Sequence, residues 1–108
     1  MDFMGEIIDD VPIVSVITKI EVLGFDAPDE DYQLLTNFMN DALVLNLNRG
    51  IVEKTIAIRK EQKVKLPDAI IAATALDNEL TLITRNTKDF KNINGLVVIN
   101  PHDGVRKI

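Results

Sequence analysis

The fold of this chain is decided by Lys65-Leu66-Pro67-Asp68-Ala69-Ile70-Ile71-Ala72-Ala73-Thr74-Ala75-Leu76. This stretch predicts a helix with Pro67 at its first position, where the missing N–H costs no hydrogen bond. Asp68 then falls in the first turn and faces the positive end of the helix dipole. Only Thr74 is polar between Ala69 and Leu76, so we expect the helix to pack inside the domain. One carboxylate is thereby fixed at the start of a buried element.

Strands and helices alternate on both sides of this helix. The expected strands are 13–16, 43–47, 80–84 and 96–99, and the expected helices are 18–23, 29–39, 49–61, 65–76 and a short one within 85–90. Residues 1–10 have apolar side chains at helical spacing and predict the end of an amphipathic helix. The pattern predicts an α/β fold, a three-layer sandwich around a mostly parallel sheet. In such sheets ligands bind at the carboxyl ends of the strands.

The composition limits the functions that this chain can have. Its 108 residues suffice for one domain, predicted over 1–101, followed by a polar tail over 102–108. A net charge of -5 argues against a broad basic surface that holds nucleic acid by itself. The chain has no cysteine and one histidine, His102, predicted to be exposed to solvent, which excludes thiolate sites and histidine clusters. No membrane-spanning run or signal pattern is present, so we expect a cytoplasmic protein.

Three acids are predicted to lie at one edge of the sheet. Glu21 follows the first strand and completes a capping box with Thr18, Asp89 follows the third strand, and Asp68 begins the buried helix. Each acid is also explained by the favourable field at a helix start. Together the three carboxylates would repel one another unless a cation lay between them. Oxygen ligands without histidine or cysteine indicate magnesium or manganese, which suit phosphodiester hydrolysis.

Three motifs resemble one family. The segments 14–24, 66–75 and 82–90, in this order, resemble the PIN domain, especially the VapC-type toxin ribonucleases of toxin–antitoxin pairs. The resemblance extends from about residue 10 to residue 101. It implies a Mg²⁺- or Mn²⁺-dependent endoribonuclease with Glu21, Asp68 and Asp89 as catalytic metal ligands. It also implies that Thr84 and Asn86 lie beside them as hydrogen-bonding neighbours, and that the partners are RNA and an antitoxin-like protein.

The sequence departs from the family pattern at its beginning. Members of the family start with a short strand that ends in an aspartate, a principal metal ligand, and these 108 residues contain no such segment. Asp2, Asp9 and Asp10 follow no apolar strand and are interpreted as solvated charges. A sheet without that strand has unpaired backbone groups, so either its two halves pair directly or a second chain covers the gap, and we expect a homodimer. The missing acid predicts weak metal binding and absent or much reduced RNA cleavage.

A second interpretation is a non-catalytic PIN-like protein that binds an antitoxin-like peptide or its own copy. A group of basic side chains fits either interpretation. They lie on the third expected helix and at the connection to the fourth. They are Lys54, Arg59, Lys60, Lys63 and Lys65. They can contact RNA, or they can simply form the solvated face of a helix.

Overall fold

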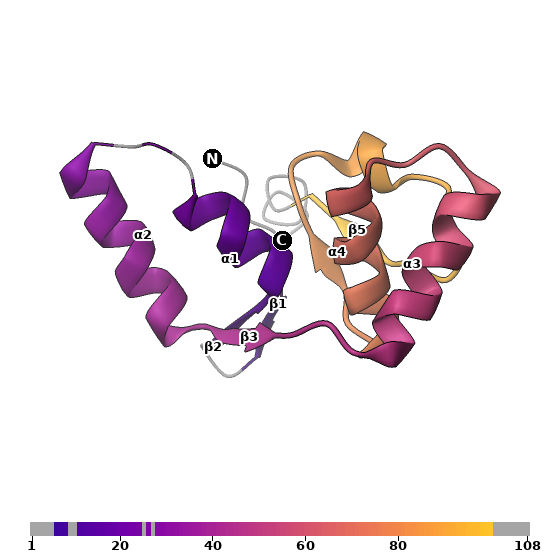
Figure 1. The fold of residues 1–108 in the computed structure, drawn as a ribbon, viewed down its shortest axis with the longest axis horizontal. Helices are drawn as coiled ribbons and strands as arrows, with labels where there is room; N and C mark the ends of the chain where they lie inside the picture. Colours follow the sequence, from indigo (N-terminus) through magenta and orange to yellow (C-terminus); the bar gives the residue numbers. More distant parts are fainter. Residues whose placement is uncertain (1–5, 9–10, 25, 27, 101–108) are drawn as a thin grey trace, which may run out of the picture.

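The computed structural model describes residues 6–8, 11–24, 26 and 28–100 (Figure 1). Its elements are β1 (Glu6–Ile8), β2 (Val11–Ser15), α1 (Val16–Leu23), α2 (Asp29–Asp41), β3 (Leu43–Leu45), α3 (Arg49–Glu61), α4 (Leu66–Asp77), β4 (Leu82–Ile83), the 3₁₀ helix η1 (Thr87–Phe90) and β5 (Val98–Ile99). The predicted tail over 102–108, with His102, lies outside the described residues, as do Asp2, Asp9 and Asp10. The predicted α/β class is confirmed.

The described strands form two sheets, where the sequence predicted one. β2 pairs in parallel with β3, and β4 pairs in parallel with β5. The helix predicted for residues 1–10 is wrong at Glu6–Ile8, which forms a strand antiparallel to β2 with Ile8 opposite Val11. The pairing satisfies backbone groups along the second edge of β2.

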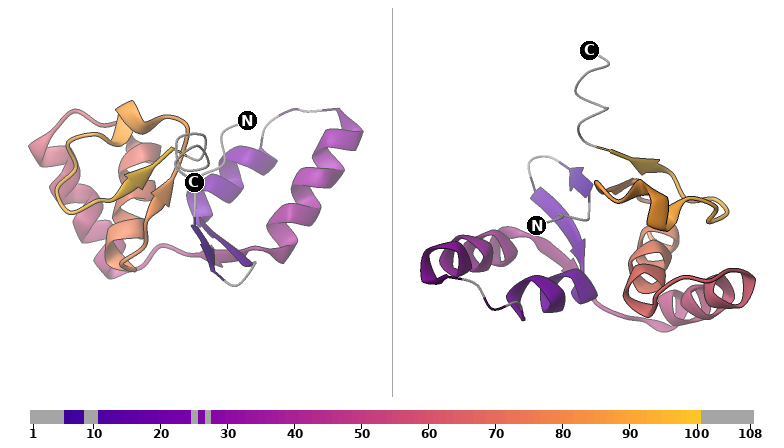
Figure 2. Two further views of the ribbon diagram at one scale, coloured as in Figure 1. Left: turned by 180° about the vertical axis from the view of Figure 1, so that it is seen from behind. Right: turned by 90° about the horizontal axis from the view of Figure 1, so that it is seen from above.

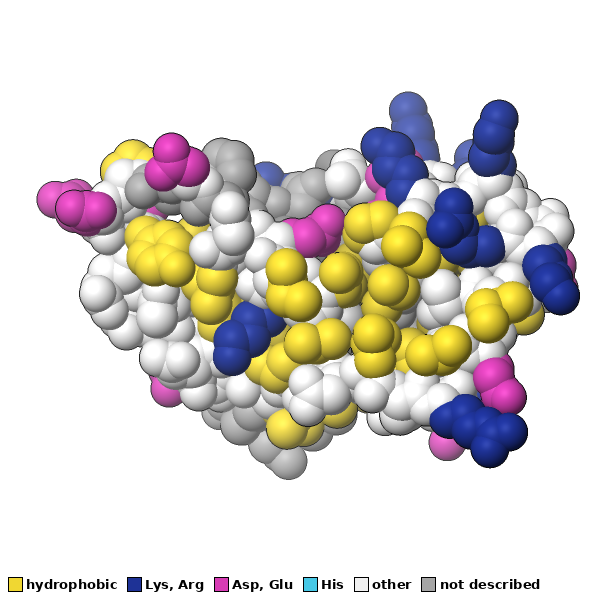
Figure 3. Space-filling model, in the orientation of Figure 1, with side chains coloured by type: hydrophobic (Ala, Val, Ile, Leu, Met, Phe, Trp, Pro, Cys, Tyr) yellow, Lys and Arg dark blue, Asp and Glu magenta, His cyan; other side chains and the backbone are white. Residues whose placement is uncertain are grey.

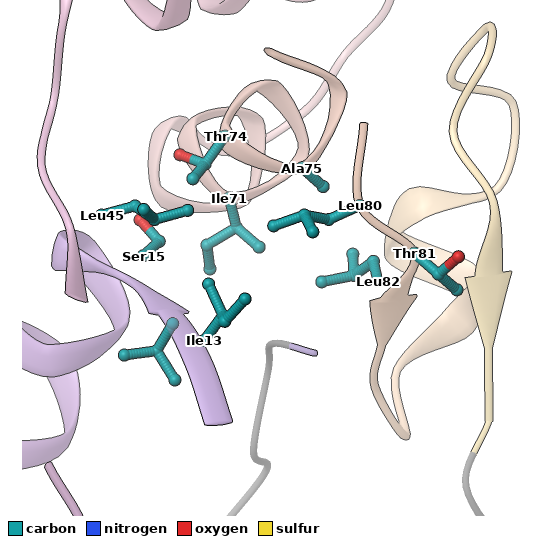
Figure 4. Close-up of a pocket in the computed structure, with 10 residues that line it drawn as sticks. Ile13, Ser15, Leu45, Ile71, Thr74, Ala75, Leu80, Thr81 and Leu82 are labelled. Carbon is teal, nitrogen blue, oxygen red and sulfur yellow. The ribbon is translucent and has the colours of Figure 1, made fainter. Parts of the chain in front are cut away.

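A small, mostly apolar pocket lies between the two sheets. Figure 4 shows Ile13 of β2, Ile71 of α4 and Leu82 of β4 around one small pocket between the sheets. The pocket has a volume of about 20 Å³, close to that of a single water-sized probe. The two described sheets do not pair directly, as one of the two expectations required, and α4 contributes Ile71, Thr74 and Ala75 to the lining of the pocket between them.

Helix α1 begins earlier than the sequence predicted. The Ser15 hydroxyl at the end of β2 accepts a hydrogen bond of 3.2 Å from the Ile17 N–H, so Ser15 is the N-cap. The predicted capping box of Thr18 and Glu21 is therefore wrong. Thr18 is buried, and its hydroxyl has no hydrogen-bond partner among the described residues. Glu21 falls in the second turn, about 7 Å along the helix axis from Val16.

Helix α3 begins where the sequence predicted and buries one narrow stripe. The Asn48 side chain accepts a hydrogen bond of 2.9 Å from the Ile51 N–H and caps the helix. The buried stripe is Ile51, Thr55 and Ile58, spaced four and three residues apart. Val52 and Ile56 are 45% and 51% exposed, because each lies one residue further round the helix than a member of this stripe.

Helix α4 is buried as predicted, and the larger core surrounds it. Ala69, Ala72 and Ala73 are fully buried, and these small side chains let α3 pack closely beside α4 (Figure 2). Its one polar residue, Thr74, donates a hydrogen bond of 2.7 Å to the Ile70 carbonyl within the helix. A smaller core, made of Val14, Val22 and Met39, lies among β2, α1 and α2. The chain thus has a rigid α3–α4 unit from which a site can be built.

Candidate functional site

Asp68 and Asp89 line one cavity of about 300 Å³. Its walls are the connector between α3 and α4, the first turn of α4, and η1 with the residues that follow it. The lining residues are Gln62, Lys63, Val64, Lys65, Asp68, Lys88, Asp89, Lys91 and Asn92. The Gln62 side-chain amide donates a hydrogen bond of 2.9 Å to the Asn92 carbonyl and ties the two walls together. Residues 30 positions apart in the sequence therefore form one site.

Asp68 is held at the half-buried end of a rigid helix. Lys65 is the N-cap of α4, Pro67 lies in the first turn, and Ala69 behind Asp68 is fully buried. Burial raises the pKa of the Asp68 carboxyl above its ordinary value of 3.8, and the negative charge of Asp89 raises this pKa further. The Lys65 ammonium opposes the increase in pKa. The two carboxylates are thus close enough to repel each other, and a bound cation would relieve that repulsion.

Asp89 is exposed on η1, whose position is fixed from both ends. Phe90, the next residue, is 1% exposed and anchors η1 in the larger core. The Asp89 N–H donates a hydrogen bond of 3.2 Å to the Asn86 carbonyl, which begins the 3₁₀ turn. The buried Thr84 hydroxyl accepts a hydrogen bond of 3.0 Å from the Asn86 N–H. Thr84 and Asn86 therefore shape the turn that carries Asp89.

Glu21 is exposed on α1, and it is not among the residues that line this cavity. Within the described part of the chain, no group of three or more His, Cys, Asp or Glu side chains is arranged to hold a metal ion. The structure thus brings Asp68 and Asp89 together and does not bring Glu21 to them.

Four lysines of the cavity were not recognised as a group from the sequence. Lys63 and Lys65 come from the α3–α4 connector, and Lys88 and Lys91 lie on either side of Asp89. Four lysines and two aspartates leave the lining with a formal charge of +2, whereas the whole chain carries -5. The spacing of Lys88 and Lys91 could have predicted that these two lysines lie together, since residues three apart share one side of a 3₁₀ helix.

The two aspartates are suitable ligands for magnesium. Mg²⁺ prefers oxygen ligands and is commonly held by one or two carboxylates together with waters and substrate phosphates. Asp68 and Asp89 provide two such groups, and their mutual repulsion is the feature that a divalent ion would offset. A pair of carboxylates without further acidic ligands predicts weak rather than tight binding.

The family model of the PIN domain matches residues 4–96. The chain belongs to the PIN-domain family. The structure of this PIN domain resembles that of a toxin–antitoxin complex from Klebsiella pneumoniae, with 42% identity and a TM-score of 0.68 over 81% of this chain and 71% of that chain. It also resembles DNA-bound VapBC from Salmonella typhimurium, with 25% identity and a TM-score of 0.71 over 81% and 73% of the two chains.

VapBC2 from Rickettsia felis, bound to a promoter DNA fragment, has the same fold at 22% identity, with a TM-score of 0.67 over 80% of this chain and 71% of that chain.

No curated protein matches the chain. None of the helices in the described residues has the length and apolar character that a membrane span requires.

Proposed function

We propose that this PIN domain is a VapC-type, magnesium-dependent endoribonuclease in which Asp68 and Asp89 hold the metal ion. The observation that carries the proposal is the meeting of these two carboxylates in one cavity whose remaining charged residues are lysines. When bound, a magnesium ion activates water and offsets the charge that develops on a phosphate. An endoribonuclease needs both a cation and a surface that tolerates a polyanion, and this cavity provides ligands for the one and positive charge for the other.

The protein contributes position and charge to this chemistry. Asp68 is fixed by the buried α4 helix, and Asp89 is fixed by the Phe90 anchor and the Thr84 turn. Burial and the negative charge of Asp89 raise the pKa of Asp68, and a bound cation would offset both effects because it favours the ionised carboxylate. The two side chains are thus held in the same cavity.

We further propose that RNA cleavage by these 108 residues is weak. A site with two carboxylates has less negative charge to attract a cation than a site with three, and it supplies fewer oxygen ligands. We therefore expect it to hold a single ion loosely. A metal-binding role for Glu21 remains a prediction, because Glu21 is not among the residues that line the cavity.

The test is cleavage of a labelled single-stranded RNA by the pure chain with Mg²⁺ or with EDTA. We expect slow cleavage that EDTA abolishes and that Asp68→Asn reduces by on the order of 100-fold, because the variant removes one of two ligands. Asp41→Asn is the matched control, since Asp41 is an exposed acid at the end of α2. Cleavage that persists in EDTA, or that survives in Asp68→Asn, would refute the proposal.

A second function, binding of an antitoxin protein, is supported by the surface. Figure 3 shows hydrophobic side chains gathered in the middle of one face, over α1, α3 and α4. The large apolar residues exposed on these helices are Ile20, Val52, Ile56 and Leu66. Exposed apolar patches of this kind mark protein interfaces. The relatives in the Klebsiella and Salmonella structures occur in complexes, one of them described as toxin–antitoxin.

This second function holds even if the chain has no catalytic activity. The test is binding of the antitoxin from the Klebsiella pneumoniae complex, measured by calorimetry. The double variant Val52→Ser and Ile56→Ser should weaken binding at least about tenfold, and Val97→Ser, an exposed apolar residue before β5, should not. The alternative is that the same surface joins two copies of this chain. In that case sedimentation of the chain alone should show a dimer, and the double variant should dissociate it.

A further inference from the structure

We propose that Lys63, Lys65, Lys88 and Lys91 form a phosphate-binding rim that holds the backbone of a single-stranded RNA across Asp68 and Asp89. This inference rests on the proposed function, and it names the residues that bind the substrate of that site. The rim has two sides. Lys63 and Lys65 lie on the α3–α4 connector, Lys88 and Lys91 lie on or next to η1, and the carboxylates share the cavity with both pairs.

The four ammonium groups are available to a ligand. Elsewhere in the described chain, Lys54 is paired with Asp77 at 3.0 Å and Arg49 with Glu53 at 3.6 Å. None of the four rim lysines forms a salt bridge with a described residue, although the charge of Lys65 acts on Asp68 and opposes the increase that burial causes in the pKa of that carboxyl. All four lysines are exposed. Unpaired lysines around a cavity attract an anion without first having to break a salt bridge.

The chemistry of the lining favours a nucleic acid backbone over its bases. The residues that line the cavity include no aromatic side chain, so they provide no stacking platform for a base. Lysine binds phosphate as a point charge and lacks the planar, bidentate fork of arginine. A volume of about 300 Å³ is at the small end of ligand pockets, which fits one strand better than a duplex. The rim therefore predicts binding that depends on salt and tolerates different sequences.

The rim also explains how an acidic chain can hold a polyanion. The net charge of the chain is -5, yet the cavity lining carries a formal charge of +2. Charge focused at a concave site acts on a bound phosphate more strongly than the distant negative charges do, because salt screens those charges over about 10 Å.

The experiment is fluorescence anisotropy of a labelled single-stranded RNA of about 12 nucleotides, titrated in EDTA so that binding is measured without cleavage. The double variants K63Q/K65Q and K88Q/K91Q should each weaken binding at least about tenfold and reduce the slope of log K against log salt by about 1 to 1.5. K88R/K91R should bind like the wild type, because it keeps both charges. K60Q is the matched control, since Lys60 is an exposed lysine on α3 outside the cavity, and it should change affinity less than twofold.

Three results would overturn the rim. They are no RNA binding by the wild type, equal weakening by K60Q and by the rim variants, and displacement of the RNA by an equal concentration of an acidic peptide. Thermal melting of each variant shows whether it is folded, which we expect because the lysines are exposed.

The same variants separate failure of the rim from failure of the nuclease. If magnesium-dependent cleavage occurs and the rim variants keep the KM of the wild type, the rim is wrong and the nuclease stands. If RNA binding falls in the rim variants but no metal-dependent cleavage is found, the nuclease is wrong and the rim stands. If both are right, the rim variants raise KM more than they lower kcat.

Discussion

The part of the chain from α3 to β5 and the part from β1 to β3 are built in different ways. In the first, α4 is buried on nearly all sides and Phe90 packs against the same core, so Asp68 and Asp89 stand on rigid supports. In the second, a small cluster of Val14, Val22 and Met39 holds the helices, and Glu21 is exposed. The larger core thus carries the acids that meet and the lysines around them. We conclude that the candidate chemistry depends on the α3–β5 part, and the following predictions test that difference.

The largest expected effect is on stability. Phe90→Ala should lower the free energy of unfolding by about 3–5 kcal/mol, and Met39→Ala should lower it by about 2–5 kcal/mol, because both side chains are 1% exposed. Urea unfolding followed by circular dichroism measures both losses. Among molecules that remain folded, Phe90→Ala should lose Mg²⁺ binding in calorimetry because η1 moves, whereas Met39→Ala should keep it. Equal loss of Mg²⁺ binding in the two variants would show that the two parts do not differ in this way.

The next effect is on catalysis. Asp89→Asn should lower magnesium-dependent RNA cleavage by on the order of 100-fold, since it removes one of the two carboxylates in the cavity. Glu21→Gln should lower cleavage by less than about tenfold, since Glu21 is not among the residues that line the cavity. Single-turnover cleavage rates at saturating enzyme compare the two variants. A Glu21→Gln rate as low as that of Asp89→Asn would place Glu21 in the metal site in solution.

Two buried threonines provide a smaller and sharper contrast. Thr84→Val leaves the Asn86 N–H without its acceptor and should cost about 1–2 kcal/mol of stability. Thr18→Val removes a buried hydroxyl that has no partner among the described residues, so the substitution should be neutral or stabilising. Chemical denaturation gives both values. Destabilisation of similar size by Thr18→Val would reveal a hydrogen bond to the Thr18 hydroxyl that the described residues do not show.

The smallest expected effect is the pH dependence of Asp68. Its pKa is raised in the folded state by burial and by Asp89, so the folded state favours the protonated carboxyl. That contribution to stability is complete below the unfolded pKa of 3.8 and is lost as the pH rises through the folded pKa. Ionised Asp68 is therefore unfavourable at pH 7, and Asp68→Asn should raise the Tm there by about 1–3 °C. Melting curves should show this difference shrinking toward zero in acid, and a difference that grows in acid would contradict the assigned cause.

The sequence predicted the elements whose signals are local. The cap at Asn48 and the apolar run after Asp68 placed α3 and α4 correctly, because each depends on residues within a few positions. The start of α1 was harder to predict, because Ser15 and Thr18 are both good N-caps and the choice between them depends on where the buried strand ends. That error placed Glu21 in the first turn of α1, whereas it lies in the second.

The cavity could be predicted only in part. Asp68 and Asp89 were identified from their positions after a break and after a strand, and the structure brings these two together. The lysine rim forms only because the α3–α4 connector contacts the chain after η1, as in the hydrogen bond between Gln62 and Asn92. No local sequence pattern predicts that contact. The strand at Glu6–Ile8 was missed because its apolar spacing also fits a helix, and its pairing with β2 decides between the two.

The central claim is that Asp68 and Asp89 together hold a divalent ion. The most direct test is titration of the ¹⁵N-labelled chain with Mn²⁺, which broadens the amide signals of residues near the bound ion. We predict selective broadening around Asp68 and Asp89 that excess Mg²⁺ reverses and that Asp68→Asn removes. Broadening centred instead on the acidic first turn of α2 at Asp29, Glu30 and Asp31, or unchanged broadening in Asp68→Asn, would contradict the claim.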